Sequence, residues 1–264
     1  MLDDHESTAK FALLRIRYIL RLSWALAWAR FKLRIAGRYL GIFWYILEPL
    51  AFFLILLSLQ INVGAASIPR YPEYLMLGLI MTNFFISTIS GSIGSIRENK
   101  NMVQSISIPQ EVLPLSTVIQ FCFSHAIEFL FFIVIIIYYG MFSWVVLWYI
   151  PIFVVFATFV LGLSFLFATL GVFIEDLNNI WSVGSRLLWL GTPIFYALTP
   201  GTLLARANDF NPLYYFMTFA RTTVVYSSVS ETAFIFGVII LSVLTLIIGE
   251  AVFSKTKISF GEYL

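Results

Sequence analysis

The sequence has few charged residues for its length. Only 11% of its 264 residues are Asp, Glu, Lys or Arg, and 60% are hydrophobic, whereas a soluble domain carries roughly 25% charged residues. The charged residues are clustered, and the apolar runs between them are about 20 residues long, the length at which a helix crosses a bilayer core of roughly 30 Å. This shortage excludes an ordinary soluble surface and predicts one membrane domain.

Cysteine, net charge and a leader sequence are also lacking. Cys122 is the one cysteine and lies in an apolar run, so an internal disulfide and a cysteine metal cluster are excluded. The formal net charge is +2, and no basic stripe indicates a nucleic-acid surface. The first ten residues, MLDDHESTAK, lack the basic region, short apolar stretch and cleavage site of a signal peptide, so we expect the mature protein to keep its start.

The apolar runs predict an all-α protein with six transmembrane helices. We place the spans at residues 42–62, 74–95, 118–139, 144–173, 180–198 and 233–253. With the N-terminus inside, thirteen of the 16 lysines and arginines fall in inner segments and three in outer ones. This positive-inside bias predicts that both termini are cytoplasmic.

Residues 22–37 predict an interfacial amphipathic helix before the first span. Apolar and aromatic side chains recur there at spacings of three and four, at Trp24, Trp28, Phe31 and Ile35. A row of basic residues runs beside this stripe, at Arg30, Arg34 and Arg38. The aromatic face would lie at the acyl boundary while the basic side chains reach the headgroups, with Ser23 as the N-cap. A cytoplasmic helix packed on a partner is the alternative.

The outer connection 199–231 is too short to cross the membrane and return, yet too apolar for a free loop. It contains two prolines, a glycine and the run PLYYFMTFARTTVVY. Backbone groups at membrane depth must be satisfied by helix or by surrounding protein. We therefore expect short re-entrant helices between spans five and six.

Four sequence stretches resemble a known family. They are RIAGRYLGIFWYILEPLAFFLILL at 34–57, YLMLGLIMTNFFISTISGSIGSIRENKNMV across the second span, IPQEVLPLSTVI before the third, and TPIFYAL followed by NPLYYF around the outer loop. In this order they resemble the permease subunits of type-2 ABC transporters that export polysaccharides and polyol phosphates. The ILEP stretch is similar to capsular polysaccharide permeases, and Ile174, Glu175 and Asp176 stand where many O-antigen exporters have an Arg-Asp pair.

The resemblance implies a multi-pass permease of the bacterial inner membrane that exports a lipid-linked glycan. No segment matches the phosphate-binding loop G-x-x-x-x-G-K-[ST], so the chain should not hydrolyse ATP by itself. The resemblance implies a separate nucleotide-binding ATPase subunit in two copies, which holds ATP and Mg²⁺, and a second copy of this permease. Capsule, O-antigen and teichoic acid remain open as the glycan.

The inner loop 95–114 is the expected contact with the ATPase. It is the one substantial inner loop between spans, and in the family a coupling helix docks here. The polar residues that we assign to this coupling role are Arg97, Glu98, Asn99, Lys100 and Gln104. A plain solvated turn that obeys the positive-inside rule is the alternative.

Several ionisable residues interrupt apolar runs, namely Glu48, His125, Glu128, Arg186 and Glu250. A charge at bilayer depth costs roughly 2.5 to 3.5 kcal/mol on insertion scales, so each is expected to face a partner, water or a pathway. A Glu48–Arg186 pair is possible. His125 and Glu128 share a helix face, and a structural contact is favoured over a proton relay because ATP-driven export needs no proton.

Aromatic residues gather at the proposed ends of spans one and five and in the outer loop. Their flat faces could stack on sugar rings along a substrate channel, although an aromatic belt at the membrane interfaces is expected in any membrane protein. The channel candidates are Phe43, Trp44, Tyr45, Glu48, Trp189, Phe195, Tyr196, Tyr214 and Tyr215.

We divide the chain into a cytoplasmic N-terminus with the interfacial helix (1–41), a transmembrane domain (42–253) and a cytoplasmic tail (254–264). Two other functions compete with glycan export. One is a type-2 ABC permease for drugs or other small substrates. The other is a membrane glycosyl- or phosphotransferase, which is disfavoured because the two histidines are His5 and His125 and no Asp-x-Asp or similar metal-ligand pair is present. No catalytic or metal-binding residue is therefore assigned.

Overall fold

The computed structural model describes the whole chain except residues 1, 37–43, 63–64, 106–107 and 264. All regular structure in the described residues is helical. The α-helices are α1 (Leu2–Ile35), α2 (Trp44–Ser58), α3 (Tyr71–Gly94), α4 (Lys100–Ser105), α5 (Val112–Tyr138), α6 (Tyr149–Phe173), α7 (Leu177–Gly191), α8 (Leu203–Asn208), α9 (Pro212–Ala220), α10 (Thr232–Thr256) and α11 (Phe260–Tyr263). Short turns of helix are η2 (Ala65–Ser67), η3 (Arg97–Asn99), η4 (Trp144–Trp148), η6 (Lys257–Ser259) and the π-helical η5 (Arg221–Val225).

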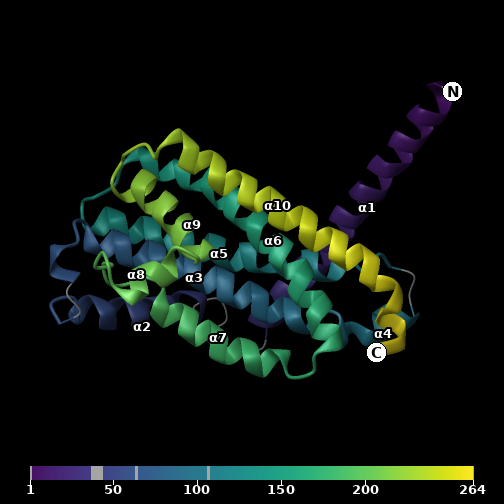
Figure 1. The fold of residues 1–264 in the computed structure, drawn as a ribbon, viewed down its shortest axis with the longest axis horizontal. Helices are drawn as coiled ribbons and strands as arrows, with labels where there is room; N and C mark the ends of the chain where they lie inside the picture. Colours follow the sequence, from purple (N-terminus) through teal and green to yellow (C-terminus); the bar gives the residue numbers. More distant parts are fainter. Residues whose placement is uncertain (1, 37–43, 63–64, 106–107, 264) are drawn as a thin grey trace.

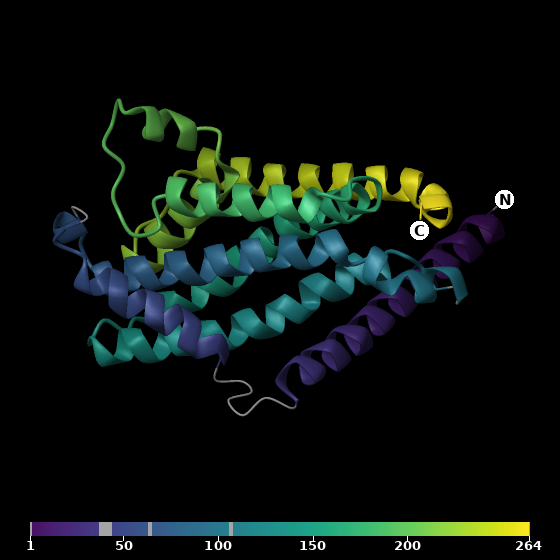
Figure 2. The same ribbon diagram turned by 90° about the horizontal axis from the view of Figure 1, so that it is seen from below.

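The long helices lie side by side in an elongated bundle with two distinct ends (Figure 1). We call the end that carries α8 and α9 the α8 end, and the end that carries α4 and α11 the α4 end. Helices α2, α3, α5, α6, α7 and α10, taken in this order, alternate in direction between these ends. Helix α1 approaches the bundle obliquely at the α4 end and lies against α5 (Figure 2).

Helix α3 is the centre of the bundle and α10 lies on its outside. Helix α3 contacts α2, α5, α6 and α7, and 72% of its apolar window is buried, compared with 17% for α10. Helix α10 packs mainly on α6. A Cβ atom at Gly162 of α6 would meet the backbone of Thr245 and Leu246, and one at Gly249 would meet the backbone of Gly162. Glycine therefore permits the close approach of these two helices, as small residues do between membrane helices.

The start of each outer helix follows from local sequence. Pro72 lies in the first turn of α3 and Pro212 in the first turn of α9, where a missing N–H leaves no helical hydrogen bond unmade. The side chain of Asn211 accepts a hydrogen bond from the N–H of Leu213 at 3.1 Å, and the Thr202 hydroxyl accepts one from the N–H of Ala205 at 3.2 Å. Both are ordinary N-caps.

Four helices are long and apolar enough to cross a membrane, within Tyr71–Gly94, Val112–Tyr138, Trp144–Phe173 and Thr232–Tyr263. They correspond to four of the six expected spans. The other two, α2 and α7, have 15 residues each, or about 22 Å of helix at 1.5 Å per residue. The expectation that residues 42–62 and 180–198 are full-length helices is thus wrong. Thr192 has extended backbone and ends α7 before Pro193, because a residue before proline is pushed out of helical geometry.

The N-terminal helix also differs from expectation. It begins at Leu2 and runs for 34 residues without a break at Ser23. Ser23 lies inside the helix, is fully buried, and its hydroxyl has no hydrogen-bond partner. It is therefore not an N-cap. The helix can extend backwards because Arg17 and Arg21 are exposed, so their charges remain in contact with polar surroundings.

Candidate functional site

The expected coupling segment forms a compact helical turn at the α4 end. It consists of η3 (Arg97–Asn99) and α4 (Lys100–Ser105). Glu98, Lys100 and Gln104 are exposed, whereas the amide of Asn99 donates to the carbonyl of Ser95 at 2.8 Å and ties the segment to the end of α3. The segment thus presents charged and polar groups outward while its backbone is fixed to the bundle.

Arg97 joins this segment to the loop after α6. Its Nη2 atom donates to the carbonyl oxygen of Val172 at 2.8 Å and lies 3.9 Å from Oε1 of Glu175. Cations near a helix C-terminus interact favourably with its free carbonyls. Two loops that are far apart in the sequence are therefore connected at the α4 end.

A second, smaller hydrophobic cluster lies behind the coupling segment. We call it the coupling cluster, and its buried members are Ile96, Leu113, Phe165, Ala168, Val172, Phe253 and Phe260. The rings of Phe253 and Phe260 are 5.4 Å apart, and the ring of Tyr263 lies 4.9 Å from that of Phe173. The C-terminal residues thus pack against the ends of α3, α5 and α6 and belong to the same packed unit as the coupling segment.

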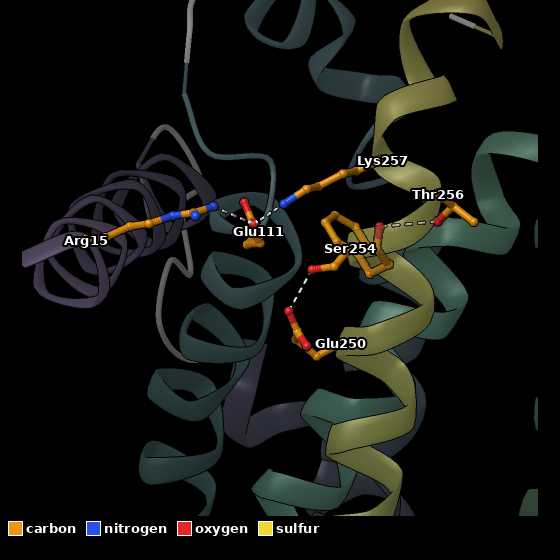
Figure 3. Close-up of polar contacts among 7 residues, drawn as sticks. Arg15, Glu111, Glu250, Ser254, Thr256 and Lys257 are labelled. Atoms are coloured by element: carbon orange, nitrogen blue, oxygen red, sulfur yellow. Dashed lines mark hydrogen bonds and ion pairs between the residues drawn. The ribbon is translucent and has the colours of Figure 1, made fainter. Parts of the chain in front are cut away.

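Glu111 at the start of α5 connects three elements (Figure 3). Its Oε1 atom accepts a hydrogen bond from Nζ of Lys257 at 2.6 Å and lies 3.4 Å from Nη2 of Arg15 in α1. Burial is the largest influence on the pKa of Glu111 and raises it, but the hydrogen bonds and the charges of Lys257 and Arg15 together lower the pKa below its ordinary value. Glu111 is therefore held ionised between the N-terminal helix and the C-terminal segment.

A cavity of about 300 Å³ lies between α2, α3 and α7. Its walls include Glu48, Asn83, Ser185, Arg186 and Trp189. The structure thus brings Glu48 and Arg186 to one cavity, as the sequence allowed, but the described residues contain no ion pair between them. The span limits expected from the sequence place Arg186 near the inner end of the fifth span. In the structure it lies well inside α7.

A buried polar cluster lies beside this cavity. Nδ1 of His125 is 3.7 Å from Oε2 of Glu128, so the expected contact on one helix face is confirmed. Nε2 of His125 is 2.8 Å from the hydroxyl of Tyr149, and the amide of Asn83 donates to Oε1 of Glu128 at 2.5 Å. Because Asn83 also lines the cavity, it connects Glu128 to the cavity wall.

The aromatic channel candidates do not form one surface. Phe43 and the side chains of Trp44 and Tyr45 lie outside the described residues. Trp189 lines the cavity, its ring 5.8 Å from that of Phe52 and 5.5 Å from that of Phe195.

The remaining three candidates lie at the α8 end. The hydroxyl of Tyr196 donates to the carbonyl of Gly191 at 2.9 Å. Tyr214 lines a separate pocket of about 230 Å³ beside Arg221. The hydroxyl of Tyr215 donates to the carbonyl of Asp209 at 2.7 Å. Of the nine candidates, Glu48 and Trp189 are the two that border the cavity with described side chains.

Sequence reasoning missed the role of Arg221. Its guanidinium is buried and donates to the carbonyls of Tyr74, Pro193 and Ile194 at 2.7–3.2 Å, and it lies over the Tyr74 ring. Arg221 thereby joins α3, the segment after α7 and η5. The single charge within the apolar run TFARTTVV was a signal, but the residue had been counted as an outer-loop cation.

Arg70 has a similar role at the same end. It adopts a left-handed backbone conformation with φ of 53°, donates to the carbonyl of Met141 at 2.8 Å, and pairs with Glu73 at 2.7 Å. It therefore connects the start of α3 to the turn after α5. No group of three His, Cys, Asp or Glu side chains that could hold a metal ion occurs in the described parts of the chain.

Comparison with known proteins gives a consistent assignment. Residues 21–225 match the ABC-2 type transporter family. The O-antigen export system permease protein RfbA of Klebsiella pneumoniae is 31% identical over 243 residues, which cover 88% of this chain and 91% of the relative. A protein of the same name from Myxococcus xanthus is 27% identical over 169 residues, covering 64% of this chain and 65% of the relative. The helical bundle with its long apolar helices, together with these matches, shows that the chain belongs to the ABC-2 type transporter family and is a membrane permease subunit.

Proposed function

We propose that this chain is the permease half of an ATP-driven exporter that moves a lipid-linked polysaccharide outward across the cytoplasmic membrane. The observation that carries the proposal is the similarity over 88% of the chain to permeases named for O-antigen export. That similarity favours O-antigen among the glycans left open by the sequence. The Glu48–Pro49 pair, which resembles capsule permeases, is the feature that points the other way.

The residues that line the cavity between α2, α3 and α7 support the proposal that the cargo is a polar polymer. It combines a carboxylate, a guanidinium and an amide with the faces of Phe52 and Trp189. Sugars are bound by such mixtures of hydrogen-bonding groups and aromatic faces. A cavity of about 300 Å³ holds only a short part of a polymer, so we propose that a second copy of the permease completes the pathway.

We further propose that α2 and α7 complete six crossings together with their flanking segments. The apolar residues Ile180, Val183, Leu187 and Leu190 of α7 are exposed, as expected for a helix that faces lipid or a second copy. In this arrangement the α4 end and both termini are cytoplasmic, and residues 199–231 are outside with α8 and α9 re-entrant.

A nucleotide-binding subunit is implied by the ABC-2 family. We propose that two copies dock at the α4 end, on the exposed faces of Glu98, Lys100 and Gln104. The support is that this segment is charged outward, bonded to α3 through Asn99 and bonded to the end of α6 through Arg97. A subunit that moved the segment would therefore also move two long helices.

Deletion of the gene in its own bacterium tests the proposed cargo. We expect lipid-linked polysaccharide to accumulate inside the cell and to disappear from the surface, with both changes reversed by the wild-type gene. Glycan profiles of inner-membrane and surface fractions measure this. An unchanged surface glycan combined with new sensitivity to a small toxic compound would support the alternative of a small-substrate exporter.

Cysteine labelling tests the orientation. Single cysteines at Ser67 and Phe210, both exposed, should react with an impermeant thiol reagent in intact cells when Cys122 is replaced by serine. A cysteine at Gln104 should react only after the cells are opened. The reverse pattern would invert the topology.

A further inference from the structure

A cavity of about 510 Å³ lies between α1, η3 and α5 at the α4 end, apart from the cavity of Glu48 and Arg186. Arg30 and Arg34 of α1 line it on one side, Glu98 and Asn99 of η3 on another, and Thr117 and Gln120 of α5 on a third. Its volume lies within the range of roughly 300 to 1,000 Å³ that is usual for small-molecule sites.

Aromatic packing fixes α1 so that its arginines face this cavity. The ring of Phe123 in α5 is contacted by Trp24, Trp28 and Phe31 of α1, with ring centroids 5.0, 5.6 and 5.5 Å apart, respectively. The guanidinium of Arg34 lies 5.1 Å from the centre of the Phe121 ring. The packing of α1 on α5 therefore sets where the guanidinium groups of Arg30 and Arg34 lie.

Arg30 is a partly buried cation held by hydroxyl groups rather than by a carboxylate within the described parts of the chain. Its Nη1 atom donates to the hydroxyls of Ser116 and Thr117 at 3.2 and 3.5 Å, and within the described residues it makes no ion pair. Burial lowers the pKa of Arg30, and the charge of Glu98 raises it only in part. An arginine remains charged even so, and a buried charge is costly unless it is paired.

The cavity carries a net positive charge. Two guanidinium groups face one carboxylate, and the other polar walls are uncharged. Guanidinium groups bind phosphate oxygens through paired, parallel hydrogen bonds. An aromatic and basic helix that packs beside an apolar bundle also suits the headgroup level of a membrane.

From these observations we infer that the cavity between α1, η3 and α5 binds the phosphate group of a lipid headgroup, held by Arg30 and Arg34. The carboxylate of Glu98 in the cavity wall repels this anion. Because Glu98 belongs to the coupling segment, an occupied cavity would place a phosphate next to the segment proposed to meet the ATPase. The inference rests on the interfacial placement that the sequence predicts for residues 22–37, but not on the identity of the exported glycan.

Binding of a labelled probe to the purified full-length chain tests the inference. The probe is radiolabelled geranylgeranyl diphosphate, measured by equilibrium dialysis in detergent micelles. We expect Arg30→Gln and Arg34→Gln each to weaken binding by about tenfold, as expected for loss of a charge-assisted contact. Glu98→Gln should strengthen binding about threefold or more, because it removes the one acidic group of the cavity wall.

Arg21→Gln is the matched control, since Arg21 is an exposed cation of the same helix outside the cavity. Its binding should stay within about twofold of the wild type, in keeping with the weak influence of exposed charges. Equal losses for Arg21→Gln and Arg34→Gln, or no gain for Glu98→Gln, would overturn the site. Because Arg34 is exposed, Arg34→Gln keeps the test valid even if Arg30→Gln misfolds.

Competition identifies the source of the phosphate. Displacement of the probe by dihexanoyl phosphatidylglycerol would support a site for membrane phospholipids, and failure to displace it would support a site for diphosphate-linked lipids. Displacement by uncharged geranylgeraniol at the same concentration would overturn the inference, since only the apolar tail would then be recognised. None of these measurements needs the ATPase or the glycan, so they can fail while the export test above succeeds.

Discussion

The two ends of the bundle are held together by different kinds of interaction. At the α8 end, Arg221 is 5% exposed and its guanidinium is bonded to backbone carbonyls of two other segments. At the α4 end, Arg97 also donates to a backbone carbonyl, that of Val172, but the ion pairs there include exposed side chains, with Arg15 and Glu175 64% and 86% exposed. Bonds to fixed, buried carbonyls leave no alternative partner, whereas exposed ion pairs exchange readily with water. The α8 end is therefore held by buried bonds to backbone, whereas the α4 end combines a packed cluster with ion pairs that face outward.

Replacement of Arg221 should weaken the α8 end and have the largest effect on stability. Arg221→Met removes the charged donor from the carbonyl of Ile194 and leaves that of Pro193 with only the Tyr74 hydroxyl. We expect a loss of about 3 to 5 kcal/mol, since each hydrogen bond from a charged group contributes about 1.5 to 3 kcal/mol. Thermal unfolding of the purified chain in detergent measures this. Arg206→Met, an exposed cation of the same outer region, should change the midpoint little. Equal stability of the two variants would refute the interpretation that the bonds of Arg221 hold the α8 end together.

The α6–α10 crossing should respond less strongly. Gly162→Ala places a methyl group against the backbone of Thr245 and Leu246, and backbone cannot move aside as a side chain can. We expect a loss of about 1 to 3 kcal/mol, as for other overpacked sites.

Gly237→Ala is the control for this crossing, because a Cβ atom there meets nothing within 4 Å. It should be neutral or slightly stabilising, since alanine favours helix over glycine by about 1 kcal/mol. A destabilised Gly237→Ala variant would show that glycine in α10 serves flexibility rather than close packing.

The Glu111 contacts should contribute about 1 kcal/mol at neutral pH, as expected for partly exposed ion pairs. The pKa of Glu111 is lowered from 4.5 in the folded protein. The contribution is therefore complete above pH 4.5 and is lost as the pH falls through the lower folded pKa. Unfolding midpoints of wild type and Glu111→Gln should differ at pH 7 and converge in acid. A difference that grows in acid would contradict the assignment.

The coupling segment should show the smallest effect on stability and a large one on export. Changing Arg97, Glu98 and Lys100 together to alanine should lower export more than about tenfold, since loss of desolvated interfacial charges costs several kcal/mol of docking. The amount of protein in the membrane should stay the same. Export and co-purification with the ATPase are the two measurements.

A control triple of Arg21, Lys255 and Glu262, exposed residues with the same net charge, should leave export unchanged. Wild-type export in the coupling triple would instead point to the loop at 175–179. Because Arg97 already contacts Val172 and Glu175, alanine at Glu175 and Asp176 would then be the variant to examine.

Much of the fold could be predicted because membrane helices are marked by length and apolarity alone. Helices α3, α5, α6 and α10 lie where continuous apolar runs predicted them. Helices α2 and α7 could not be delimited, since their flanking residues are equally apolar and their ends depend on local backbone geometry such as that at Thr192 and Pro193. The predicted helix at 22–37 was shorter than α1, which begins at Leu2. The difference arises because an exposed helical face tolerates basic residues that a buried face would not.

By itself, the sequence determined that the protein spans a membrane, that lysines and arginines are concentrated in a few segments between apolar runs, and that His125 and Glu128 lie close enough to interact. Each of these depends on composition or on spacing within one helix. Only the tertiary structure decided that Glu48 and Arg186 share a cavity, that Glu111 meets Arg15 and Lys257, and that Arg221 is buried. Those contacts join segments up to 147 residues apart, and their partners are set by the packing of helices, which no local spacing encodes.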